Sequence, residues 1–113
     1  MAAPSIGAVV LVRFPFSDLS ETKLRPAVVL AKVGHRDYIL SQITSNAYSD
    51  AKAIEIRDEH FSHGSLRRIS YIRPGKLFTA NDSLIIREVG TLNPQVRLIV
   101  IDAIEKLLRA GLS

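Results

Sequence analysis

The chain contains no cysteine and no tryptophan among its 113 residues. Without cysteine it can form no disulfide framework, no thiolate zinc site, no iron–sulfur cluster and no cysteine nucleophile. It has no apolar run near the roughly 20 residues that cross a bilayer, so we expect no membrane association. No basic residue precedes Arg13 at the apolar N-terminal stretch, so we expect no signal peptide and a cytoplasmic protein. Glycine-rich phosphate loops, Walker motifs and Gly-x-Ser-x-Gly are also absent, which excludes nucleotide-driven and classical hydrolases.

The composition that is present suits one packed domain spanning residues 1–113. Apolar residues make up 47% of the chain, which is too much for a disordered protein. Fifteen basic residues against eleven acidic ones give a formal net charge of +4. This excess favours anionic partners and permits nucleic acid without requiring it.

Hydrophobic periodicity predicts several short strands followed by one helix. The expected strands cover 8–14, 26–33, 38–44, 53–57, 66–73 and 84–89, with a short piece at 77–78. Polar segments 17–23, 45–50 and 58–64 are expected as loops, and Pro74-Gly75 as the end of a strand. Asn93-Pro94 is typical of a helix start, and apolar residues with helical spacing continue from there toward Gly111. The fold class is therefore α+β, mainly β, with a small barrel-like sheet.

Three blocks of the sequence appear in an order typical of one protein family. They are VLVRFPFSDLSETKLRPAVVL (10–30), ILSQITS (39–45), and ISYIRPGKLF (69–78) followed by LIIREVG (84–90) and the C-terminal helix. Together they resemble the MazF/PemK-type toxins of toxin–antitoxin systems. The resemblance implies a small SH3-like antiparallel barrel (MazF/PemK/CcdB-like) with a C-terminal α-helix, and a homodimer. It also implies a metal-independent endoribonuclease of single-stranded RNA or mRNA that needs no cofactor, and a cognate antitoxin with an acidic tail.

The resemblance aligns Arg25 and Thr44 with the family's catalytic residues. In cleavage by an adjacent 2′-hydroxyl, which gives a 2′,3′-cyclic phosphate, negative charge gathers on the phosphoryl oxygens. A guanidinium can donate two hydrogen bonds to these oxygens, which a lysine cannot match. A hydroxyl at residue 44 can bond a phosphate oxygen or orient the attacking group. Judged by spacing alone, a solvated loop arginine and a strand-end threonine remain open alternatives.

A second group of residues is expected to bind the RNA. Arginine binds phosphate and tyrosine can stack on a base, which is the usual combination for single-stranded RNA. The expected RNA-binding residues are Ser17, Asp18, Ser45, Arg67, Tyr71 and Arg73.

Other interpretations of the sequence remain open. His60 and His63 are spaced for a metal on a helix, but their segment lacks helical periodicity, so we expect a solvated loop and no metal site. Ala8, Ser70 and Gly75 stand where relatives often have acidic residues, which leaves the general base unassigned. The alternative functions are a non-enzymatic toxin of the same fold that inhibits a protein such as a topoisomerase, and a degenerate relative that binds RNA without cutting it.

Overall fold

The computed structural model describes residues 3–15, 22–47 and 50–112. Its strands are β1 (Ala8–Pro15), β2 (Thr22–Gly34), β3 (Asp37–Thr44), β4 (Ile54–Ile56), β5 (Phe61–Gly64), β6 (Ser70–Asn81) and β7 (Ile85–Leu92). Helix α1 (Pro94–Arg109) follows, and short 3-10 turns lie at η1 (Asp58–His60), η2 (Asp82–Leu84) and η3 (Ala110–Leu112). The strands form one antiparallel sheet in the order β4-β6-β3-β2-β1-β7-β5.

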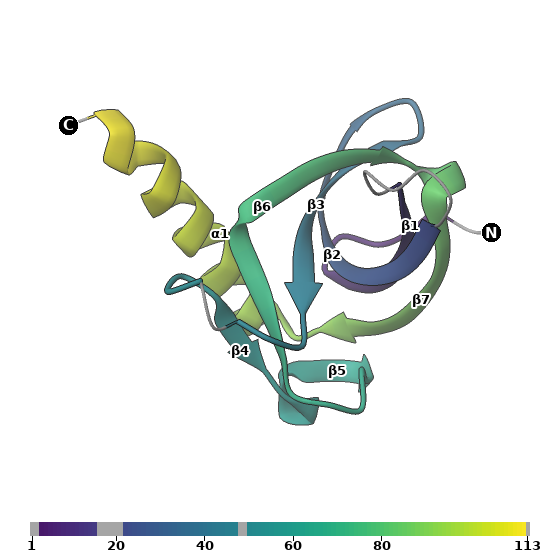
Figure 1. Cartoon of the computed structure of the whole chain (residues 1–113), viewed down its shortest axis with the longest axis horizontal. Helices are drawn as coiled ribbons and strands as arrows, with labels where there is room; N and C mark the ends of the chain where they lie inside the picture. The colour runs from purple at the N-terminus through teal and green to yellow at the C-terminus, as the bar shows by residue number, and fades with distance from the viewer. Residues whose placement is uncertain (1–2, 16–21, 48–49, 113) are drawn as a thin grey trace.

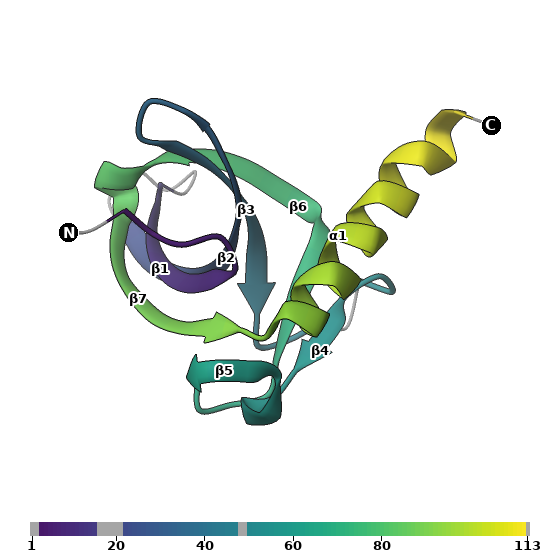
Figure 2. The same cartoon turned by 180° about the vertical axis from the view of Figure 1, so that it is seen from behind.

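The sheet curls into a small barrel from which the helix projects. Figure 1 shows β1, β2, β3, β7 and the upper arc of β6 wrapped around a common interior, with β4 and β5 below it. Seen from behind in Figure 2, α1 starts beside the sheet and extends away from the barrel to the C-terminus. The predicted fold, a mainly β barrel-like sheet with one C-terminal helix, is confirmed.

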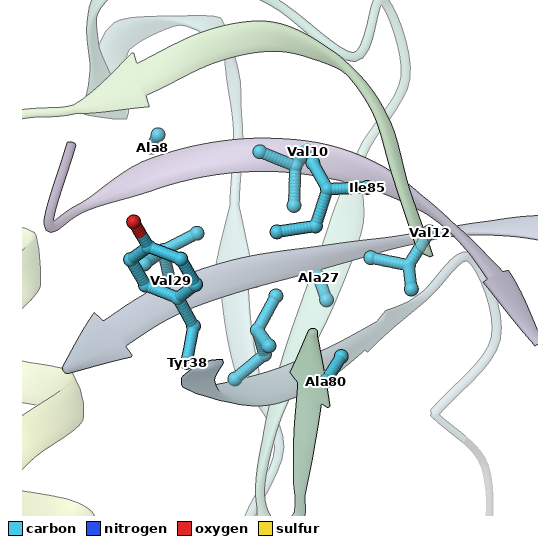
Figure 3. Close-up of a cluster of buried hydrophobic side chains, with 9 residues drawn as sticks. Ala8, Val10, Val12, Ala27, Val29, Tyr38, Ala80 and Ile85 are labelled. Atoms are coloured by element: carbon cyan, nitrogen blue, oxygen red, sulfur yellow. The ribbon is translucent and has the colours of Figure 1, made fainter. Parts of the chain in front are cut away.

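The two faces of the sheet pack into two separate hydrophobic clusters. Side chains from β1, β2, β3, β6 and β7 fill the barrel interior (Figure 3). The opposite face of these strands packs against α1, which buries Val96, Val100 and Ile104. Because successive side chains of a strand alternate between faces, each strand contributes to both clusters. Tyr38 and Leu40, for example, point into the barrel, while Ile43 points toward the helix cluster.

The predicted end of a strand at Pro74-Gly75 is wrong. β6 runs through both residues, because the register between β3 and β6 shifts between Ser41 and Ile43. The shift leaves residues 73–76 outside the β3 ladder, where a missing backbone donor is tolerated. Ser41 stabilises this bulge by donating its hydroxyl to the carbonyl of Arg73 at 2.6 Å.

Other strand boundaries also differ from the prediction, since β6 begins at Ser70 rather than at residue 66 and β7 ends at Leu92 rather than at residue 89. β2 begins at Thr22 rather than at Pro26, and Pro26 lies opposite Leu11 of β1, one residue before the β3 ladder starts. Residues 61–64 are a strand, β5, and not a loop, because Phe61 packs on the helix cluster. Gly64 has φ +75° and lies against the backbone of Val89 and Gly90, an approach that only glycine permits.

The predicted start of the helix is confirmed. The Asn93 side chain accepts a hydrogen bond from the Val96 backbone N–H at 3.0 Å, and Pro94 occupies the first helical position. Within the described residues, no helix has the length and apolar character that crossing a membrane requires.

Candidate functional site

Side chains from neighbouring strands line up on one face of the sheet, just beyond the filled barrel interior. Thr44 of β3 lies directly opposite Tyr71 of β6, and Tyr71 lies directly opposite Glu55 of β4. Residues paired in this way share a face of the sheet. We call Arg25, Thr44, Tyr71 and Glu55 the cross-strand row. On β3 the row follows the barrel-facing positions Tyr38 and Leu40, which are buried, and Gln42, which is only partly buried.

Arg25 joins this row through the register of β2. Its alternation with Ala27 and Val29 places it on the barrel-facing side, opposite Val12 of β1. The β2–β3 ladder ends at Ala27 and Gln42; extending its register by two residues on each strand aligns Arg25 with Thr44. Arg25 is half-buried, with its Nε shielded from solvent. The two predicted catalytic residues therefore belong to adjacent positions of one sheet face.

The Thr44 hydroxyl is held by the chain that follows it. Its Oγ1 accepts a hydrogen bond from the Asn46 N–H at 3.2 Å and donates one to the Asn46 carbonyl at 3.1 Å. This local turn fixes the side-chain rotamer at the end of β3. Because a hydroxyl hydrogen can rotate, the same oxygen can keep the N–H bond and redirect its own hydrogen to a ligand.

An open hollow of about 380 Å³ lies beside Thr44. Among the described residues, Ser45, Asn46, Ala47 and Tyr71 line it. Two of the predicted RNA-binding residues, Ser45 and Tyr71, are therefore brought together next to the predicted catalytic threonine.

Arg73 lies on the same face as Tyr71, and its guanidinium is engaged within the protein. Its Nε donates to Asp50 Oδ2 at 2.8 Å, and both side chains are largely shielded from solvent. The hydrogen bond from Arg73 holds the pKa of Asp50 below its ordinary value, with further help from the Lys52 backbone N–H. The pair ties Asp50 to β6, so Arg73 has a structural contact as well as its predicted RNA-binding role.

Sequence reasoning missed Glu55 and Arg57. Arg57 Nε donates to Glu55 Oε2 at 2.8 Å, and this bond raises the pKa of the Arg57 guanidinium, with smaller effects from Glu59 and Tyr71. The sequence did carry a signal, since charged residues alternate with Ile54 and Ile56 in a short strand. What the sequence lacked was the pairing that puts Glu55 opposite Tyr71.

Arg67 lies outside the cross-strand row, although it lines a hollow of about 280 Å³ together with Arg57. It has φ 61°, its backbone N–H donates to Ser65 Oγ at 2.7 Å, and it lines a hollow of about 630 Å³ with Leu11, Arg87 and Glu88. Leu11 belongs to the strand face opposite to that of Val12 and Arg25. The structure therefore does not place Arg67 in the cross-strand row.

The remaining predicted positions are not part of this cluster. Ser17 and Asp18 lie outside the described residues. His60 Nδ1 accepts from the Arg57 N–H at 2.8 Å, and His63 Nε2 lies 3.3 Å from Thr91 Oγ1. In the described ranges, no group of three or more histidine, aspartate or glutamate side chains is arranged to hold a metal ion.

The chain is similar to a known protein family. Residues 5–108 match the family model described as PemK-like, MazF-like toxin of type II toxin–antitoxin system. A search of curated proteins gave no match.

Solved structures share the fold at low sequence identity. A chain of the MazE–MazF crystal structure from Deinococcus radiodurans superposes with a TM-score of 0.76 at 18% identity, covering 100% of both chains. The toxin MazF-mt6 of Mycobacterium tuberculosis gives 0.68 at 16% identity over 88% of this chain and 93% of that one. An endoribonuclease in complex with its cognate antitoxin, from a mycobacterial species, gives 0.63 at 14% identity over 99% and 95%.

Proposed function

The chain belongs to the PemK-like, MazF-like toxins of type II toxin–antitoxin systems, and from this premise we propose that it is an endoribonuclease of single-stranded RNA. The observation that carries the proposal is the placement of Arg25 and Thr44, both partly exposed, on adjacent strands of one sheet face. The neighbouring hollow with Tyr71 gives an unstacked base a ring to lie against.

The proposed reaction is an internal transfer at phosphorus. The 2′-oxygen of a nucleotide attacks the adjacent phosphorus, the bond to the 5′-oxygen breaks, and the products are a 2′,3′-cyclic phosphate and a 5′-hydroxyl. The 2′-hydroxyl loses its proton to a base, and the departing 5′-oxygen gains one. Arg25 donates to the phosphoryl oxygens as negative charge builds up on them. Thr44 keeps the bond from the Asn46 N–H and turns its own hydrogen toward a phosphoryl oxygen.

Cleavage in the presence of EDTA tests this function. We expect purified protein to cut a long single-stranded RNA without a divalent metal, because a guanidinium and a hydroxyl supply the charge stabilisation. The fragments should end in a 2′,3′-cyclic phosphate and begin with a 5′-hydroxyl, as end mapping will reveal. An RNA with a 2′-deoxy nucleotide at the mapped site should remain intact there. RNA that is bound but never cut would instead support a degenerate relative, and RNA that is neither bound nor cut would support an inhibitor of a protein target.

The proposed partners are a cognate antitoxin and a second copy of the chain. An acidic antitoxin tail would pair its carboxylates with the arginines that hold phosphate, so inhibition would be competitive with RNA. The net charge of +4 is consistent with both ligands. Cytoplasmic location also belongs to this proposal.

We expect a homodimer held together by α1. Leu98, Ile101 and Leu108 are 65%, 44% and 61% exposed on the 16-residue helix, a stripe that a second copy would cover. In a two-fold symmetric dimer the same surface of each copy forms the interface, so one substitution introduces two changes into it. Leu98→Asp should therefore raise the dimer dissociation constant about 100-fold or more in sedimentation equilibrium.

The control for that substitution is Lys106→Asp, which places a carboxylate at an exposed residue of the same helix that lies on a different side from the Leu98 stripe. It should leave the association unchanged. A wild-type protein that sediments as a monomer at every concentration would contradict the expected dimer.

A further inference from the structure

The exposed edge of the sheet next to Tyr71 carries a pre-formed ion pair. β4 is the terminal strand of the sheet, and its Glu55 lies directly opposite Tyr71. The guanidinium of Arg57 donates through Nε to Glu55 Oε2 at 2.8 Å.

The pair is not needed to hold the strand in place. Glu55 and Arg57 are 45% and 48% exposed, and ion pairs this open to water contribute little to stability. The strand is fixed from its other face, where Ile56 is buried in the helix cluster and Ile54 packs against it. The charged face of β4 is thus presented to solvent on the side of Tyr71 away from Thr44, and Arg57 lines a separate hollow of about 280 Å³ there.

We propose that the Glu55–Arg57 pair reads the identity of one nucleobase that stacks on Tyr71, and that it selects bases with an exocyclic amino group over uracil. This inference rests on the proposed endoribonuclease function and adds a specificity-determining element to it. Adjacent strands lie about 4.8 Å apart, so Glu55 is about 10 Å from Thr44 across β6. The base it reads therefore belongs to a nucleotide flanking the scissile phosphate.

The selectivity follows from the donor and acceptor patterns of the bases. A carboxylate oxygen accepts well from an amino group such as N4 of cytosine, N6 of adenine or N2 of guanine. In each of these bases a ring nitrogen or carbonyl near the amino group can accept from the guanidinium. The only Watson–Crick-edge donor of uracil is N3–H, and the carbonyls on both sides of it repel a carboxylate. The bond between Arg57 and Glu55 fixes both planar groups, so little ordering is needed when a base arrives.

The test is the cleavage profile of Glu55→Gln against a pool of RNAs with random sequence around the cut, read by sequencing the ends. For the wild-type protein we expect uracil to be disfavoured about ten-fold or more at one flanking position. In Glu55→Gln this discrimination should fall to about three-fold or less, because an amide can donate to the uracil carbonyls as well as accept. Preferences at the other positions, and the rate at the best site to within about ten-fold, should remain.

Glu105→Gln is the matched control, since Glu105 forms an exposed ion pair with Arg109 on α1, far along the chain from the row. It should leave the whole profile unchanged. A Glu55→Gln profile identical to that of the wild-type protein would overturn this inference alone and leave the nuclease assignment standing. A wild-type protein that cuts no RNA would overturn the proposed function and this inference with it.

Discussion

Arg25→Ala is expected to slow RNA cleavage about 10²–10³-fold, the usual cost of losing one preorganised donor at a developing negative charge. Arg25 is held on one side by its pairing with Val12 of β1, and the β3 ladder begins two residues later. Its side chain is half-buried with Nε shielded from solvent, which restricts the guanidinium before the substrate binds, so the loss should appear in kcat more than in KM. Single-turnover cleavage of one defined RNA measures this directly.

Two further variants serve as controls. The first separates the two hydrogen bonds that a guanidinium can donate from its positive charge, and the second tests an arginine outside the site. Arg25→Lys keeps the positive charge and should recover little of the rate, because an ammonium cannot bond two phosphoryl oxygens in one plane. Arg13→Ala removes an exposed arginine at the same end of the sheet whose side chain lies on the opposite face, and it should stay within about three-fold of the wild-type rate. A folded Arg25→Ala protein that cuts at a near-normal rate would contradict the assignment of Arg25.

The sequence was sufficient for most of the strands and for the helix. Strand alternation and the helix start at Asn93-Pro94 depend on residues that are close together in the sequence, so they can be predicted from it. It failed at Pro74, because tolerance of a proline inside β6 depends on a bulge created by the register with β3. It failed also at β5, whose short polar sequence becomes a strand only because Phe61 and Gly64 meet β7.

The same distinction applies to the site. The candidates Arg25, Thr44 and Tyr71 come from motifs shared with a family, and pairing across β2, β3 and β6 aligns them on one face. Glu55 lies outside those motifs and joins the row only through the pairing of β4 with β6. Arg73 and Asp50 are 23 residues apart in the sequence, so no local pattern predicts their contact. Arg67 shows the reverse case, because it is near Tyr71 in sequence but is not paired into the row, and it lines two other hollows, one of them with Arg57.

Thr44→Val is expected to slow cleavage about 10²-fold with little effect on stability, because valine keeps the volume and β-branching of threonine and loses only the hydroxyl. The hydroxyl has two partners in the structure, the N–H and the carbonyl of Asn46. If its hydrogen turns to the phosphoryl oxygen in the transition state, the loss falls on kcat. If it served only to hold the turn, the hollow beside it would change shape and the loss would fall on KM and on RNA binding.

Thr44→Ser is the control for that distinction. Serine retains an oxygen that can accept from the Asn46 N–H and donate to phosphate, and it removes only a methyl group. It should recover most of the lost rate, within about ten-fold of the wild-type protein, at an unchanged KM. Equal and small effects of valine and serine would show that the hydroxyl takes no part in the reaction. In that case the charge on the phosphoryl oxygens would be stabilised from the Arg25 side of the row alone, and Arg25→Ala would be the more damaging of the two substitutions by a wide margin.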